Sequence, residues 1–103
     1  MYVVREIMYC KPGRVRPMVE KLKALNQLGT KYHMPHMRIM TDMCAERYWT
    51  VVAEMEVPDL KSFEELMQMP QVGDDDAKAF QEVMKDYHDL VDVGRREIYK
   101  VEG

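Results

Sequence analysis

Residues 46–57 read ERYWTVVAEMEV and contain the clearest alternation in the chain. Every second position from Trp49 to Val57 is apolar, and the acidic residues Glu54 and Glu56 lie between these positions. A period of two places alternate side chains on opposite faces of a β-strand. We therefore predict a strand over residues 46–57, with the face that contains Trp49 packed against the core.

The neighbouring segments extend this strand into a sheet. Residues 36–42 also alternate, and only a short turn over residues 42–45 separates them from residues 46–57, which predicts an antiparallel hairpin. Residues 2–10 are rich in Val, Ile and Tyr, and both of their faces are mostly apolar, which is typical of a strand covered on both sides. Residues 95–101 are predicted to be the last strand.

The segments between these strands have the spacing of amphipathic helices. Residues 14–31 place apolar side chains at intervals of three and four, and residues 60–68 form a shorter helix of the same kind. A break is predicted at residues 69–73, because it contains both proline and glycine. A further helical stretch is predicted to begin at residues 75–76 and to end at Gly94.

The predicted order of elements is β-α-β-β-α-α-β, which is that of the ferredoxin-like, split βαβ plan. This α+β fold has a four-stranded antiparallel sheet with helices on one face. The chain has 103 residues and a mass of 12.2 kDa, and no linker or repeat divides it. Residues 1–103 are therefore predicted to form a single domain.

The sheet face away from the helices is predicted to be apolar. We expect this face to carry the residues Val4, Met8, Met40, Tyr48 and Val52. A monomer rarely exposes so much contiguous apolar surface. We therefore expect a homodimer in which this face is the subunit interface.

Three segments in a fixed order carry a resemblance to a known superfamily. They are residues 11–14 (KPGR) after the first strand, residues 58–64 (PDLKSFE) after the strand with Trp49, and residues 94–99 (GRREIY) at the close. With them the chain resembles the dimeric α+β barrel superfamily and, within it, the NIPSNAP-like proteins. The resemblance implies a homodimer whose two sheets form a closed barrel. Similar proteins include cofactor-free monooxygenases acting on aromatic polyketides, haem-degrading enzymes and lactone isomerases, so the fold leaves the activity open.

A ligand pocket is expected between the sheet and the two main helices. Trp49 is predicted to form its wall, with Tyr9, Arg5 and His33 nearest its mouth. We expect a small aromatic or carbonyl ligand, because aromatic rings stack on planar groups and hydroxyls bind oxygens. Arg5 needs an anionic partner, which is either a carboxylate on a neighbouring strand or subunit, or an acidic group of the ligand.

Histidines are the candidates for catalysis, although the catalytic residues stay unassigned. His33, His36 and His88 are each considered as a general base, because an imidazole titrates near neutral pH. His33 and His36 lie three residues apart without a third ligand, so no metal site is predicted. The haem-degrading proteins use a Trp, a helical His and an Asn on the first strand. Trp49 and His88 resemble the first two of these residues. Residues 2–10 contain no Asn, so neither haem nor another cofactor is predicted.

Composition argues against several classes of partner. The formal net charge is −3, which does not favour nucleic acid. No apolar run approaches the roughly 18 residues of a membrane span. No basic segment followed by an apolar stretch indicates a secretory signal, so a cytoplasmic location is expected. In that compartment Cys10 and Cys44 are expected to be buried thiols.

Two hypotheses about function therefore remain. One is a small enzyme, a cofactor-independent monooxygenase or isomerase. The other is a non-catalytic dimeric module for binding or interaction. Polar groups that converge on a cleft would favour the enzyme, whereas a filled interior would favour the module.

Overall fold

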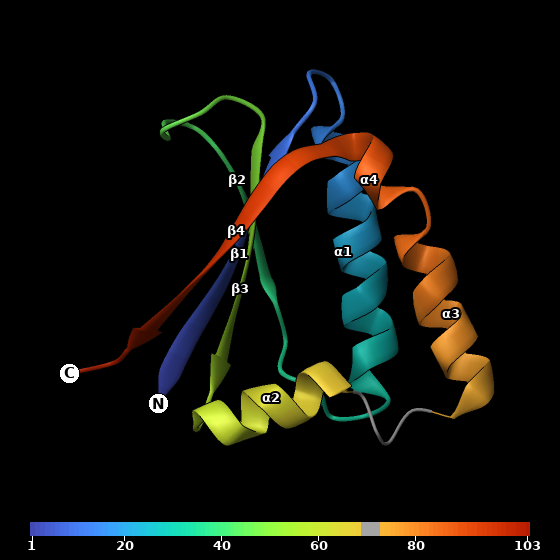
Figure 1. Cartoon of the computed structure of the whole chain (residues 1–103), viewed down its shortest axis with the longest axis vertical. Coiled ribbons are helices and arrows are strands. Elements are labelled where there is room, and N and C mark those ends of the chain that lie inside the picture. Colours follow the sequence, from blue (N-terminus) through green and yellow to red (C-terminus); the bar gives the residue numbers. More distant parts are fainter. Residues whose placement is uncertain (69–72) are drawn as a thin grey trace.

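The protein forms one layer of antiparallel β-sheet with helices on one face (Figure 1). This computed structural model describes residues 1–68 and 73–103. Its elements, in chain order, are β1 (Tyr2–Cys10), α1 (Val15–Thr30), β2 (Arg38–Thr41), β3 (Thr50–Val57), α2 (Leu60–Gln68), α3 (Asp74–Met84), α4 (Tyr87–Leu90) and β4 (Val91–Lys100). The sheet order is β2-β3-β1-β4, and neighbouring strands are antiparallel. The predicted α+β, ferredoxin-like fold is confirmed.

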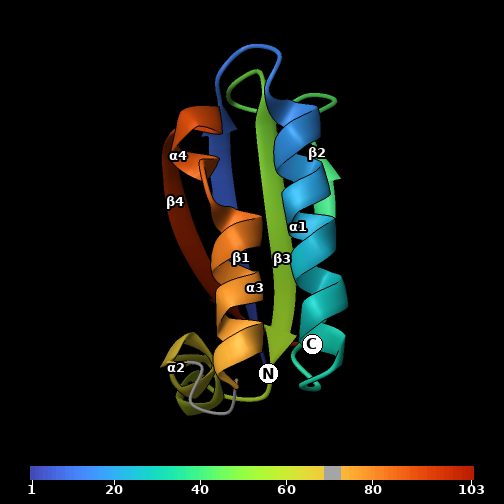
Figure 2. The same cartoon turned by 90° about the vertical axis from the view of Figure 1, so that its right-hand side faces the viewer.

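The helices cover the sheet as the periodicity predicts. α1 and α3 run side by side along it, and α2 lies across one end (Figures 1 and 2). The apolar stripe of α1 buries Met18, Val19 and Leu22. The last predicted helical stretch is divided into α3 and α4, because Asp86 has a left-handed φ of 67° between them. None of the described helices has the length and apolar character needed to cross a membrane.

The hairpin strands are shorter than predicted. β2 covers residues 38–41 rather than 36–42. β3 begins at Thr50 rather than at residue 46, because Trp49 has a φ of 62°, and a left-handed residue cannot continue a strand. The break predicted at residues 69–73 lies outside the described residues except for its last position.

The last strand is longer than predicted. β4 begins at Val91 rather than at residue 95, so Gly94 lies within the strand and does not end a helix. Gly94 pairs with Met8 of β1. A Cβ at Gly94 would lie 3.1 Å from the backbone oxygen of Ile7, so glycine allows the two strands to approach closely here.

The register between β1 and β3 decides which side chains meet the helices. Val4 lies opposite Met55, and Met8 lies opposite Val51. These residues contact the helices, so we call their side of the sheet the inner face and the opposite side the outer face. The even positions of β1 therefore share the inner face with the odd positions of β3.

The predicted assignment of faces is right for β3 and wrong for β1. Val4 and Met8 lie on the inner face, whereas Met40 and Val52 lie on the outer face as expected. Tyr48, also expected on the outer face, lies in the loop before β3. Both faces of β1 are mostly apolar with one charge each, so their alternation did not distinguish inside from outside.

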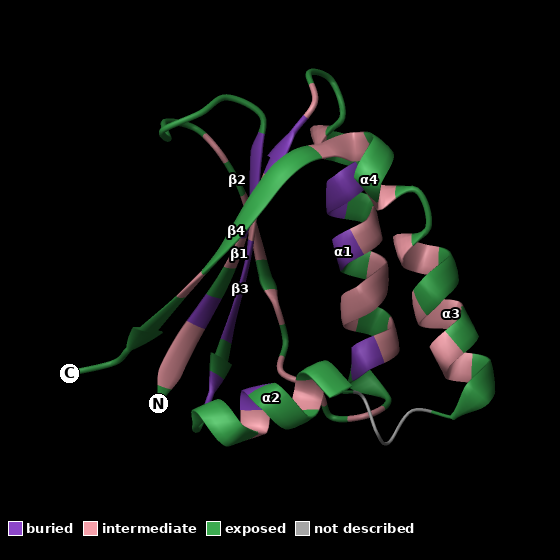
Figure 3. Cartoon of the chain, viewed as in Figure 1, coloured by how far each residue is buried: buried purple, intermediate pink, exposed green. Residues whose placement is uncertain are grey.

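The core lies between the inner face and the helices. The buried residues are concentrated on β1, β3 and α1 (Figure 3). One cluster joins the buried side of α1 to the sheet and consists of Cys10, Met18, Val19, Leu22, Val51 and Ala53. A second cluster lies at α2 and consists of Val4, Met55, Val57 and Phe63. The predicted helix-facing apolar series of β3 is thus confirmed from Val51 to Val57.

The two cysteines differ in their surroundings. Cys10 is buried as predicted, and burial raises the pKa of its thiol. Cys44 is exposed, so the prediction of a buried thiol is wrong there. It lies in the loop between β2 and β3, where neither a strand nor a helix covers it.

We expect Met18→Ala to lower the free energy of unfolding by about 2–5 kcal/mol, because the fully buried side chain leaves a cavity. Met43→Ala is the matched control, since Met43 is 100% exposed and its loss should change stability by less than about 0.5 kcal/mol. Urea denaturation followed by circular dichroism measures both. Equal losses in the two variants would contradict the core described above.

Candidate functional site

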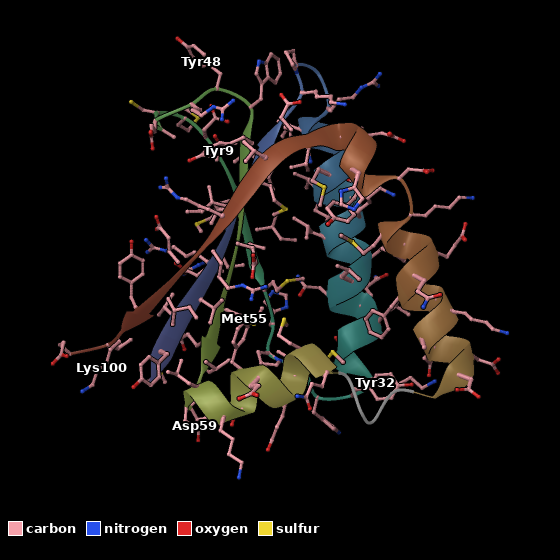
Figure 4. The ribbon with its side chains drawn as sticks, viewed as in Figure 1. Tyr9, Tyr32, Tyr48, Met55, Asp59 and Lys100 are labelled. Atoms are coloured by element: carbon pink, nitrogen blue, oxygen red, sulfur yellow. The ribbon has the colours of Figure 1, made fainter. Side chains whose placement is uncertain are left out.

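The loop over residues 42–49 connects β2 to β3 and projects beyond the end of the sheet (Figure 1). Tyr48 is 86% exposed, and Figure 4 shows it pointing away from the sheet. Met43 in the same loop is also fully exposed. The loop therefore presents large apolar side chains to solvent.

Hydrogen bonds hold both ends of this loop. The Asp42 amide donates to the Thr50 carbonyl at 3.2 Å, and the Thr50 amide donates to Asp42 Oδ1 at 2.9 Å. Thr50 Oγ1 donates to the Arg47 carbonyl at 2.7 Å, and the Cys10 amide donates to the Trp49 carbonyl at 2.8 Å. Together they keep Trp49 left-handed, a conformation that is strained for a bulky residue and that persists only where its surroundings enforce it.

A groove of about 460 Å³ lies beside this strained residue. We call it the Trp49 groove, and its lining residues are Val15, Thr41, Asp42, Tyr48 and Trp49. Trp49 is 44% exposed, so its indole borders solvent as well as the groove. Asp42 is the one charged residue among the described residues that line it. The Thr50 amide donates a hydrogen bond to Asp42 Oδ1, and none of the described residues donates one to Asp42 Oδ2.

A second hollow lies on the outer face of the sheet. Its walls combine the apolar side chains Ile7, Met40 and Val52 with the charged side chains Arg5, Arg38, Glu54 and Glu97. This hollow adjoins the Trp49 groove, because Thr41 and Asp42 line both.

A buried carboxylate organises the charges of the outer face. Glu54 is only 6% exposed, and each of its oxygens accepts a hydrogen bond from a guanidinium. Arg5 Nε donates to Oε1 at 2.7 Å, and Arg38 Nη2 donates to Oε2. The hydrogen bonds from Arg38 and Arg5 lower the pKa of the Glu54 carboxyl, because they favour its charged form. The predicted partner of Arg5 on a neighbouring strand is therefore Glu54.

The structure does not bring the four predicted pocket residues together. Trp49 lines its own groove, and Arg5 lies in the outer-face hollow. Tyr9 is buried on the outer face, with the Arg47 guanidinium 4.4 Å from its ring centre. His33 is exposed after α1, with a left-handed φ of 56°. The assignment of Arg5 and Tyr9 to the helix-facing side is wrong, because it followed the wrong face of β1.

The three histidines lie on separate parts of the chain. His33 and His36 are both exposed in the segment between α1 and β2, and His36 borders a shallow hollow beside Arg38. His88 is exposed on α4, where its ring centre lies 3.9 Å from that of Tyr87. Within residues 1–68 and 73–103, no three His, Cys, Asp or Glu side chains gather in a way that could hold a metal ion.

Sequence reasoning missed Asp42, Glu54 and Arg38 as site residues. A signal for Glu54 and Arg38 was present, since both occupy the polar register of adjacent hairpin strands, where opposite charges pair. No comparable signal marked Asp42, because its place beside Trp49 depends on how the loop folds back. Trp49 itself was expected on a strand face and is instead in the loop.

Solved structures share this fold at low sequence identity. An uncharacterised NIPSNAP domain protein from Burkholderia xenovorans has a TM-score of 0.70 at 15% identity, covering 98% of this chain and 94% of that one. A NIPSNAP family protein from Agrobacterium tumefaciens has a TM-score of 0.74 at 9% identity, covering 96% and 90%. A Deinococcus radiodurans protein described as a candidate antibiotic biosynthesis monooxygenase has a TM-score of 0.69 at 9% identity, covering 100% and 94%.

No protein-family model matches the sequence, and no curated protein matches it. At the identities above, the likeness shows the fold and leaves the activity open. The predicted resemblance to NIPSNAP-like proteins is confirmed at the level of the fold.

We expect Glu54→Gln to lower the free energy of unfolding at pH 7 by roughly 1–3 kcal/mol, because two guanidiniums lose their charged acceptor. The folded-state pKa of Glu54 is lowered, so its contribution is present above the unfolded-state pKa of about 4.3 and is lost as the pH falls through the folded value. The wild type should therefore lose stability more steeply than the variant in this acid range.

Glu56→Gln is the control for this prediction, since Glu56 is exposed two residues further along the same strand. Urea denaturation between about pH 7 and pH 3 measures both variants. Parallel pH profiles for the wild type and Glu54→Gln would show that the buried carboxylate does not supply the acid dependence.

Proposed function

We propose that the protein is a homodimer that binds a small molecule in the Trp49 groove and uses the outer face of its sheet as the subunit interface. The strained, half-exposed Trp49 carries the proposal for the groove. Strain of this kind concentrates at sites where it serves function. Fluorescence titration of Trp49, described below, tests it.

A binding role is supported over acid–base catalysis by the positions of the polar groups. Aromatic side chains and one carboxylate border the Trp49 groove, and none of the three histidines lines it. A general acid or base must lie within hydrogen-bonding reach of its substrate. The packed clusters between sheet and helices also agree with the filled interior expected of a binding module.

The proposed interface is supported by apolar side chains on the outer face. Val93 and Tyr99 of β4 are each 49% exposed there, and Met40 and Val52 are half-buried. A second copy of the chain would cover these side chains, together with the Glu54 ion pairs. Covering such a patch is favourable because apolar area leaves water.

A cofactor-independent monooxygenase or isomerase is the second candidate. The likeness in fold to a Deinococcus radiodurans protein described as a candidate antibiotic biosynthesis monooxygenase favours it. An oxygen electrode separates a monooxygenase from a binding protein. Uptake of O₂ with a polyhydroxylated aromatic substrate, in proportion to protein concentration, would favour the monooxygenase.

We expect the wild type to scatter light as a dimer at micromolar concentration and Val52→Glu to scatter as a single chain of 12.2 kDa. The substituted carboxylate would lie within the proposed interface, where burying an unpaired charge is costly. Such monomers should aggregate or unfold more readily, because the outer face loses its cover. Leu60→Glu, an exposed position on α2, is the control and should remain dimeric. A wild type that stays monomeric contradicts the interface.

We expect at least one small molecule to quench the fluorescence of Trp49 in a saturable manner. Trp49 is the only tryptophan, so the signal reports one place. The panel comprises flat aromatic acids, quinones, haem and small amines. Trp49→Phe should abolish the signal, and His33→Ala should leave it unchanged, because His33 does not line the groove. If no compound in the panel perturbs Trp49, the proposed ligand site is wrong.

A further inference from the structure

We infer that the Trp49 groove binds a small organic cation, an ammonium group that carries apolar substituents. The inference takes its location from the proposed function and adds the chemical class of the ligand. The two depend on different observations, since the location follows from Trp49 and the class follows from the groove's charge and its aromatic rings.

The lining supplies the two kinds of group that such a cation needs. Trp49 and Tyr48 contribute aromatic rings, and a cation is attracted to the electron-rich faces of indole and phenol. Asp42 contributes a carboxylate whose Oδ2 has no donor among the described residues. Val15 and Thr41 complete the lining with methyl groups, which suit apolar substituents on the ligand.

The lining of the groove, among the described residues, carries one charged side chain, the carboxylate of Asp42. The loop over residues 42–49 contains one cation, Arg47, and its guanidinium lies against Tyr9 on the outer face. Arg47 does not line the groove. None of the described residues forms an ion pair with Asp42, so an anionic ligand would meet repulsion from it. A neutral aromatic ligand could stack on Trp49 but would leave Oδ2 without a partner, so charge complementarity favours the cation.

Asp42→Asn tests the role of the negative charge without changing the structure of the loop. Asparagine keeps the carbonyl oxygen that accepts the Thr50 amide, so the end of the loop stays closed while the negative charge is removed. Glu46→Gln is the matched control, because it makes the same change of charge in the same loop at a residue outside the lining. Trp49→Gly removes the indole and suits the left-handed backbone at that position.

The probe pair is choline and its uncharged carbon analogue 3,3-dimethylbutan-1-ol, titrated into the full-length protein in low-salt buffer. Fluorescence of Trp49 reports binding to the wild type, Asp42→Asn and Glu46→Gln, and calorimetry reports binding to Trp49→Gly. We expect choline to bind the wild type and Glu46→Gln equally, and to bind Asp42→Asn and Trp49→Gly each about tenfold more weakly. The uncharged analogue should bind all of the proteins weakly.

Other outcomes overturn the inference in distinguishable ways. Equal binding of choline and its uncharged analogue would assign the groove to apolar ligands. Quenching by aromatic acids or quinones without any response to choline would leave the proposed ligand site in place and reject the cation. No response to any compound would reject both the cation and the ligand site. If Trp49→Gly fails to fold, as judged by circular dichroism, the comparison of Asp42→Asn with Glu46→Gln still decides the role of the charge.

Discussion

The register of β1 against β3 is the constraint on which both faces of the sheet depend. Val4 opposite Met55 directs the even positions of β1 into the core, and the same register directs Arg5 to the outer face beside Glu54. A slip of one residue would exchange the two sets and would bury the guanidinium under the helices. The apolar core and the outer ion pairs are thus two results of a single pairing.

Periodicity predicted most of the fold, because the longer helices and the hairpin each have one clearly apolar side. β1 was ambiguous on the same grounds, since the odd and even series of a strand covered on both sides are nearly equal in hydrophobicity. Only the partner strand resolves such a case, and pairing between residues about fifty positions apart is not a local property of the sequence. The predicted pocket depended on the wrong choice of face for β1. It therefore combined Trp49 with Arg5 and Tyr9, which lie on the outer face of the sheet.

The candidate site shows a different limit of sequence reasoning. Trp49 continues the alternation of β3 without a break, yet its backbone leaves the strand because three hydrogen bonds close the loop around Asp42 and Thr50. Local propensity favours an aromatic residue in a strand, and tertiary contacts override it here. As a result, the indole of Trp49 does not fill the core. It lines a groove together with Asp42.

The position of β1 in the sheet also has a consequence for synthesis on the ribosome. β1 is synthesised before the other elements described above, but one of its two edges pairs with β4, the last of them, which ends at Lys100. The Val101 amide donates to the Met1 carbonyl at 3.0 Å, so the pairing of these two strands continues to Met1. A nascent chain can form the hairpin and α1 early, but one edge of β1 stays unpaired until β4 has been synthesised. Slow translation of residues 91–100 should therefore lengthen the time in which nascent chains can associate wrongly.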